Sequence, residues 1–344
     1  MLWETGVSEA RHSSIKISDL AARFAANSAY RTAQGWELDQ MLSSAPQSEP
    51  RRETTTRPSA FVTVSVDDGH STDLTTADLL SKFGLKATFY VPRQNPERPV
   101  VEPLQMRELS TAFDVGGHTL SHTPLPELRE DGAWNEIRGC KDWLEDLLGR
   151  PATSFCYPQG KYNRQLRNLV AKARFVGART CQFNLNCFPA DPFQAGVSTH
   201  AFSHSVIAQV RHSLLQRNLM GLLGFVKING MTTDWENHFR RALDWVEISG
   251  GVAHLYLHSW EIQRRNEWDK LTRVFRDAAR RKQIVPITNG ELFSLATAMK
   301  RESLDGATLV NASFGCSKAL DCILSKSRTD ENGPATELPL NSPH

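Results

Sequence analysis

Two adjacent carboxylates follow the first strongly apolar segment of the chain. Residues 61–66 read FVTVSV, a β-branched, apolar run that predicts a buried strand, and Asp67 and Asp68 come directly after it. Two carboxylates at the end of a buried strand repel each other and lose solvation, so they need a cation or a proton nearby. Gly69 lets the backbone turn so that both can face one pocket. The alternative is a cap and turn before the next helix.

A pair of histidines forms the second polar group. His118 and His122 stand four residues apart, just after a short predicted strand that ends at Gly116 and Gly117. Two His at this spacing can meet on one side of a turn, which is a common arrangement of metal ligands. With one Asp they would make a three-ligand site for a divalent metal and leave positions open for water and substrate. The pair alone is a weak signal in a chain with 11 His, but its place after a strand favours a metal site.

Two later strands also end in polar groups. Residues 157–160 read YPQG, which predicts either a rigid turn that aims backbone N–H groups at a substrate oxygen or an ordinary strand-to-helix turn. Residues 252–257 predict a strand, and His258 follows it as a candidate general acid or base. Trp260 offers a flat surface for a sugar ring. The alternative for His258 is a buried ring that is hydrogen-bonded to the backbone.

These groups need strands that end at one edge of a sheet, and residues 59–300 predict such a sheet. The expected strands cover residues 61–66, 86–91, 154–157, 175–178, 252–257 and 284–287, and the expected helices cover 75–83, 104–113, 128–148, 163–173, 237–247, 268–281 and 291–299. Repeated strand–helix units imply a parallel sheet with right-handed crossovers, and catalytic groups collect where such strands end. The stretch has the size of one α/β barrel domain. Residues 181–235 show no readable pattern.

The order of the motifs resembles that of the polysaccharide deacetylases, the NodB-homology domains of carbohydrate esterase family four. Asp-Asp-Gly, His-x-x-x-His, Tyr-Pro-x-Gly and Leu-x-His occur in that order over residues 59–300. The resemblance implies an α/β fold, a distorted (β/α) barrel of the glycoside hydrolase–deacetylase type with fewer strands than the regular eight. It also implies an enzyme that removes N-acetyl groups from a saccharide or saccharide precursor by hydrolysis.

The same resemblance assigns the chemical roles. Asp68, His118 and His122 would hold a divalent metal, which is usually zinc in this family. Asp67 would be the general base that takes a proton from water, and His258 would be the general acid that protonates the leaving amine. The metal would acidify water and polarise the acetyl carbonyl.

Four further residues are expected to bind the substrate or to support the base. The backbone N–H of Gln159 would stabilise the oxyanion, and Tyr157 and Trp260 would line the site. Family members often carry an Arg that orients the base at the position held here by Cys156, so we expect Arg179, at the next strand end, to supply that charge. A thiol nucleophile at Cys156 is the alternative, but it leaves the Asp and His groups without a role.

Composition narrows the remaining function classes. The chain has 40 Lys and Arg against 38 Asp and Glu, a net charge of +2, which argues against a dedicated nucleic-acid binder. No apolar run is long enough to span a bilayer, and the start of the chain lacks the basic region and apolar core of a signal peptide. We therefore expect a cytoplasmic protein. The resemblance to deacetylases implies that it binds an acetylated saccharide, and the sequence gives no prediction of its oligomeric state.

The two ends of the chain differ from the middle. Residues 1–58 predict an extension with a helix over 18–41 followed by a polar linker, and residues 301–344 predict a disordered tail. Three other functions stay open: a deacylase of a non-sugar amide or O-acetyl ester with the same site, a non-catalytic carbohydrate-binding barrel, and a two-metal phosphoesterase. The complete set of base and ligands argues against the second, and the single compact ligand set argues against the third.

Overall fold

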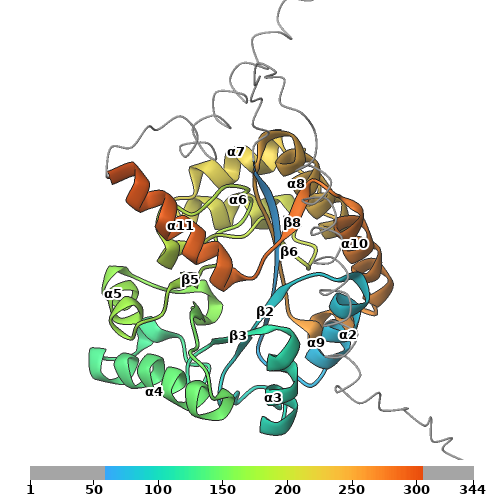
Figure 1. Ribbon diagram of the computed structural model, residues 1–344. Coiled ribbons are helices and arrows are strands. Elements are labelled where there is room, and N and C mark those ends of the chain that lie inside the picture. The colour runs from blue at the N-terminus through green and yellow to red at the C-terminus, as the bar shows by residue number, and fades with distance from the viewer. Residues whose placement is uncertain (1–58, 305–344) are drawn as a thin grey trace, which may run out of the picture.

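The structure is a computed structural model that describes residues 59–304 (Figure 1). The helix expected over 18–41, its linker and the tail from residue 305 lie outside the described residues. Residues 301–304, which the sequence assigns to the tail, instead continue the last helix. No helix within residues 59–304 combines the length and the apolar character that a bilayer crossing requires.

Parallel strands form one sheet through the middle of this region. Their bounds are β1 (Ala60–Asp67), β2 (Ala87–Val91), β3 (Asp114–Gly117), β4 (Ser154–Cys156), β5 (Gly177–Arg179), β6 (Thr199–His200), β7 (Gly251–Leu257) and β8 (Ile284–Pro286). The hydrogen-bonded order is β5-β4-β3-β2-β1-β7-β6, and β8 also pairs with β1. Every strand pairing is parallel, so the carboxyl ends of the strands share one edge of the sheet.

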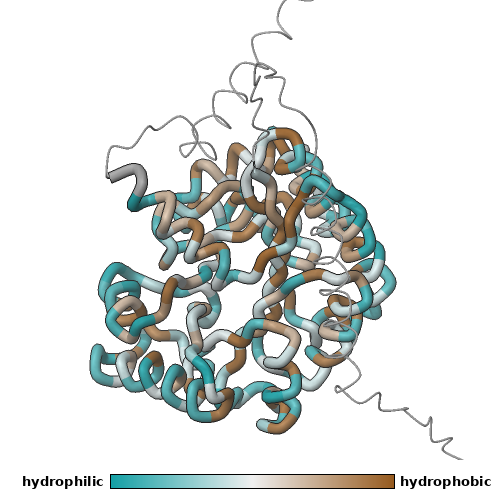
Figure 2. Tube along the Cα trace, in the orientation of Figure 1, coloured by the Kyte–Doolittle hydropathy of each residue, from teal (hydrophilic) through white to brown (hydrophobic). Residues whose placement is uncertain are grey.

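Helices pack around the outside of the sheet (Figure 1). Their bounds are α2 (Asp73–Phe83), α3 (Pro103–Ala112), α4 (Glu130–Leu148), α5 (Arg164–Lys172), α6 (Val206–Leu215), α7 (Leu219–Lys227), α8 (Trp235–Ser249), α9 (Ser259–Arg265), α10 (Trp268–Arg280) and α11 (Asn289–Leu304). The sheet curls into a half-barrel whose end strands are β5 and β6, which confirms the expected distorted (β/α) barrel. Figure 2 shows the hydrophobic residues concentrated on the central strands, and hydrophilic residues on the outer helices.

The distortion of the barrel is clearest at β1. One edge of this strand pairs with β7 from Ala60 to Val66. The other edge is shared, because β8 pairs with its first half and β2 with its second half. Seven of its eight residues are buried, which explains the continuous apolar run in the sequence. The strand therefore holds Asp67, its last residue, in a fixed place.

Most predicted elements are present, with ends shifted by a few residues, but four elements are absent from the prediction. These are β6, α6 and α7 in the stretch without a readable pattern, and α9 directly after His258. Helices α6 and α7 escaped detection because their apolar residues do not mark a buried face: α6 buries Gln209 and Ser213. Helix α9 has only seven residues, too few for a periodic pattern.

Candidate active site

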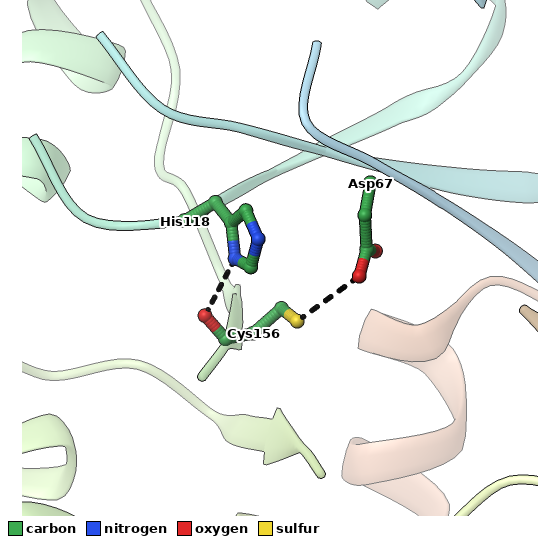
Figure 3. Close-up of side chains that lie close together, drawn as sticks. All are labelled: Asp67, His118 and Cys156. Atoms are coloured by element: carbon green, nitrogen blue, oxygen red, sulfur yellow. Dashed lines mark hydrogen bonds between the residues drawn. The ribbon is translucent and has the colours of Figure 1, made fainter. Parts of the chain in front are cut away.

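The carboxyl edge of the sheet brings the predicted catalytic residues together. Asp67 ends β1, His118 follows β3, Cys156 ends β4, Arg179 ends β5 and His258 follows β7. These strands come from widely separated parts of the chain, and only their parallel pairing brings the side chains together. Figure 3 shows Asp67 and His118 on either side of Cys156.

Asp68, His118 and His122 form a candidate metal centre. The Asp68 Oδ1 atom lies 3.0 Å from His122 Nε2 and 3.8 Å from His118 Nε2. The potential ligand atoms of all three residues lie within 4.8 Å of one another. His118 donates its Nδ1 proton to the carbonyl of Cys156 at 2.9 Å, which leaves Nε2 free to bind a cation. This donor set fits a divalent metal such as zinc.

The protonation states of these residues agree with a cation site. Burial alone would raise the pKa of Asp68, but the hydrogen bond to His122 and the charges of the three neighbouring His lower it far below its usual value. Burial lowers the pKa of His118 to about 4. An ionised carboxylate and a neutral imidazole therefore face each other at neutral pH, which are the forms that bind a metal.

A second group, Asp67, His118 and Cys156, is also close enough to hold an ion, but its atoms have other partners. Arg179 Nη2 donates to Asp67 Oδ2 and also contacts Cys156 Sγ at 2.8 Å. The Cys156 thiol lies 3.6 Å from the same carboxylate oxygen (Figure 3). Burial raises the pKa of Cys156 well above its usual value, so the thiol is neutral and the geometry argues against a thiol nucleophile.

Arg179 lies behind Asp67 rather than in the path of a substrate. Its side chain is fully buried, and its guanidinium carbon lies 4.5 Å from the centre of the Tyr256 ring. Burial alone would raise the pKa of Asp67, but Arg179, followed by His118 and His258, lowers it by more. The expected charge beside Asp67 is therefore present, whereas the expected contact of Arg179 with substrate is not compatible with its burial.

His258 is held by a carboxylate on the helix that follows it. Its Nδ1 donates to Glu261 Oε2 at 2.8 Å, and His200 Nε2 donates to the same oxygen at 3.0 Å. His204 lies 3.0 Å from the other nitrogen of His200. Burial favours the neutral ring of His258, but the hydrogen bond to Glu261 and the charges of Asp68 and Asp67 raise its pKa. The raised pKa favours the protonated ring, and the Nε2 atom of His258 lies 4.0 Å from Asp68 Oδ2 in the site.

Trp260 and Arg98 close the side of the site next to His258. The Trp260 Nε1 donates to Asp68 Oδ2 at 2.9 Å. The guanidinium carbon of Arg98 lies 3.7 Å from the centre of the Trp260 ring, and its Nη1 lies 3.8 Å from Asp68 Oδ2. Arg98 therefore covers one face of the Trp260 ring, and the centre of the His258 ring lies 5.6 Å from the centre of the Trp260 ring. The sequence offered no signal for Arg98, which follows β2 in a loop.

Several site residues adopt left-handed backbone angles. The φ angles are 77° at Asp68, 66° at Thr119 and 57° at both His122 and Gln159. Non-glycine residues rarely adopt this conformation, and it persists where the surroundings enforce it. Gly69, with a φ of 63°, completes the turn after β1 as expected.

Glu136 on α4 holds the loop between the two candidate ligand histidines. Its carboxylate accepts the backbone N–H groups of Leu120 and Ser121 at 2.8 and 2.9 Å, and the Ser121 hydroxyl at 2.7 Å. The sequence could not single out this residue, because a Glu on an amphipathic helix normally faces solvent.

The YPQG turn contains two residues that were expected to contact substrate, Tyr157 and Gln159, and the first is buried whereas the second is exposed. The Tyr157 side chain is fully buried and donates to the Phe193 carbonyl at 3.2 Å, so its expected contact with substrate is not compatible with its position. Gln159 is exposed. Its left-handed angle belongs to the tight turn between Pro158 and Gly160.

Residues 54–178 match the polysaccharide deacetylase family model. The resemblance to polysaccharide deacetylases is thus confirmed. A curated relative, the peptidoglycan-N-acetylglucosamine deacetylase of Bacillus cereus, is 28% identical over 169 residues. This alignment covers 47% of the present chain and only 59% of the relative.

Solved structures of deacetylases are also similar. A variant of the peptidoglycan deacetylase PdaC from Bacillus subtilis is 17% identical, with a TM-score of 0.43 over 72% of this chain and 96% of that one. A family 4 carbohydrate esterase from Streptomyces lividans, in complex with acetate, is 14% identical, with a TM-score of 0.40 over 66% of this chain and 91% of that one.

Proposed function

We propose that the protein removes N-acetyl groups from a saccharide or saccharide precursor by metal-dependent hydrolysis. The observation that carries this proposal is the meeting of a candidate ligand set (Asp68, His118 and His122) with an ionised carboxylate at Asp67 and with the imidazole of His258, whose pKa is raised by the carboxylates around it. Amide hydrolysis needs this combination, because water must lose a proton while the leaving nitrogen gains one.

Asp68, His118 and His122 would hold the cation, with zinc the best match to two imidazoles and a carboxylate. When bound there, it supplies Lewis acidity, which polarises a carbonyl oxygen and acidifies water. Trp260 binds Asp68 Oδ2, so it orients this carboxylate with Oδ1 toward the two histidines.

Asp67 would take the proton from the attacking water. Its Oδ1 is buried and has no hydrogen-bond partner among the described residues, whereas Oδ2 is held by Arg179. His258 would give its Nε2 proton to the leaving amine, because Nδ1 is fixed by Glu261. The backbone N–H of Gln159, in its exposed turn, would donate to the developing oxyanion.

The substrate is proposed to be an N-acetylated hexosamine unit, which is what the name of the Bacillus cereus relative indicates for that protein. Trp260 would pack against the sugar ring. The expected cytoplasmic location stays a prediction, and it would make the substrate a precursor rather than a mature polymer. A non-sugar amide or an O-acetyl ester would use the same site.

Two variants separate the metal site from the base. His118→Ala should lose bound metal and activity together, whereas Asp67→Asn should keep the metal and lose activity. The measurements are metal content of the purified protein and acetate release from N-acetylated chito-oligosaccharides, sugar nucleotides and O-acetylated sugars. Acetate release by Asp67→Asn at the wild-type rate would contradict the mechanism. Release only from O-acetylated sugars would favour the esterase alternative.

A further inference from the structure

Exposed hydrophobic residues are concentrated on one part of the protein. Of the twelve large hydrophobic residues exposed within residues 59–304, eight lie between residues 206 and 231. Helices α6 and α7 carry most of them. We call the α6–α7 face the surface formed by Ile207, Leu214, Leu215, Leu219, Leu223 and Val226. Figure 2 shows hydrophobic colouring at the top of the view, where Figure 1 places α7.

These two helices turn their apolar residues outward, whereas ordinary surface helices turn them toward the core. Their outward positions follow helical spacing, at 207, 214 and 215 in α6 and at 219, 223 and 226 in α7, and these positions are apolar. Their inward positions are polar or small: α6 buries Gln209 and Ser213, and α7 buries Gly221 and Gly224 beside Phe225. Exposed fractions reach 80% at Ile207 and 70% at Leu215. Such a face needs an apolar partner.

The hairpin cannot rotate to bury this face against the barrel. Asn218 caps α7 through Gly221 N at 2.7 Å and donates to the Phe183 carbonyl at 2.8 Å. A Cβ atom at Gly221 would lie 2.4 Å from the Phe183 carbonyl oxygen, and one at Gly224 would lie 2.6 Å from that of Asn184. These close backbone contacts require glycine on the inner side, so the apolar side is held outward.

The charged residues of the α6–α7 hairpin itself are all positive. No Asp or Glu occurs between Asp191 and Asp234, whereas Arg211, Arg217 and Lys227 lie on the hairpin and are exposed. A second copy of the chain in a two-fold dimer across this face would bring these like charges together. A purely polar polyanion would leave the leucines in water. An apolar layer behind a negatively charged surface satisfies both features, and that is the structure of an anionic lipid bilayer.

We propose that the α6–α7 face docks the protein on the surface of an anionic lipid bilayer. The leucines and Ile207 insert at the level of the headgroups, while Arg211, Arg217 and Lys227 contact the lipid phosphates. No helix crosses the bilayer in this arrangement. The face lies near the part of the site that holds His258, the proposed general acid. The His212 ring of α6 lies 5.9 Å from Phe183, and Phe183 stacks on His200 at 6.2 Å.

The test is co-sedimentation of the full chain with vesicles. Vesicles of phosphatidylcholine with phosphatidylglycerol should retain the protein, and vesicles of phosphatidylcholine alone should retain much less. The double variant Leu215→Glu/Leu219→Glu should bind at least about tenfold more weakly. Each of Arg211→Gln and Arg217→Gln should weaken binding about fivefold, with the loss reduced at high salt.

Leu104→Glu is the matched control, because Leu104 is 68% exposed but lies on α3, at the opposite end of the view in Figure 1. It should bind as the wild type does. Failure of the wild-type chain to bind anionic vesicles would overturn the proposal, as would equal losses in Leu104→Glu and the double variant. A dimer that the double variant dissociates, together with no vesicle binding, would assign the face to a second copy and likewise overturn it. Acetate release is not a readout here, so these outcomes are independent of the proposed reaction.

Discussion

The ion pair between Arg179 and Asp67 provides the most direct test of how the site works. Arg179→Cys removes the guanidinium from a pair whose side chains are 0% and 4% exposed. Breaking one partner of a buried pair costs about 3–5 kcal/mol, because the remaining charge is left without compensation. Arg179 is the largest influence that lowers the pKa of Asp67, so removing it lets burial raise that pKa. A protonated Asp67 cannot accept a proton from water, so the variant should be both less stable and less active.

The strand register supplies a rescue for this variant. Cys156 on β4 pairs directly with Arg179 on β5, so the two side chains are neighbours, and Arg179 already contacts the Cys156 sulfur. The exchange variant Cys156→Arg/Arg179→Cys therefore moves the charge across one strand while keeping the same two side chains. Cys156→Arg alone places two guanidinium groups beside one carboxylate and serves as the control for added charge. The exchange variant should recover most of the stability and rate.

The assays are acetate release as a function of pH and urea unfolding of all four proteins. Arg179→Cys should lower kcat/KM by about 10²-fold or more, the contribution of a positioned general base, and should move the acid limb of the profile to higher pH. The double-mutant cycle should give a favourable coupling energy between positions 156 and 179. An Arg179→Cys enzyme with the wild-type rate and an unchanged acid limb would refute the role given to this pair.

Three other predictions follow from neighbouring residues. Glu261→Gln removes a charge that raises the pKa of His258, so the basic limb of kcat/KM should move to lower pH, and an unmoved limb would argue against this link. Glu136→Ala releases the loop between the ligand histidines and should weaken metal binding about 10–100-fold in calorimetric titration, with Glu130→Ala as the exposed control. His238, away from these residues, is buried on α8 between Thr199 and Asn229, which lie 2.7 and 2.8 Å from its two ring nitrogens. Burial lowers the pKa of His238 to about 3, so the unfolded chain takes up its proton first and stability is lost as pH falls below about 6.5. This group should cost about 2 kcal/mol between pH 7 and pH 5 in urea unfolding, and His238→Gln should lack that part of the loss.

The strand ends of the site were predictable because their signals are local. A buried β-branched strand, a glycine turn and two carboxylates lie within nine residues at 61–69, and the His pair lies within five at 118–122. The rule that parallel strands share a carboxyl edge then implies that these groups meet. The structure places Asp67, Asp68, His118, His122 and His258 together at that edge, as expected.

Other site residues could not be found this way, because their roles depend on contacts between distant segments. Arg98, Glu136 and His200 carry no motif, and each reaches the site through a neighbour: Trp260, the histidine loop or Glu261. Tyr157 shows the reverse error. A motif suggested contact with substrate, but the side chain packs inward.

The sequence by itself determined the parallel barrel and the set of groups available for catalysis, because hydrophobic periodicity and strand-end motifs are written in short windows. Only the tertiary structure decided which atom of each group is free, since that depends on hydrogen bonds across strands, as between Arg179 and Asp67 or Trp260 and Asp68. It also decided that α6 and α7 turn their leucines to the surface. The physical reason is that an apolar stripe in the sequence shows only that one face of a helix needs an apolar partner. The close backbone contacts at Gly221 and Gly224 determine which face of the hairpin packs on the barrel.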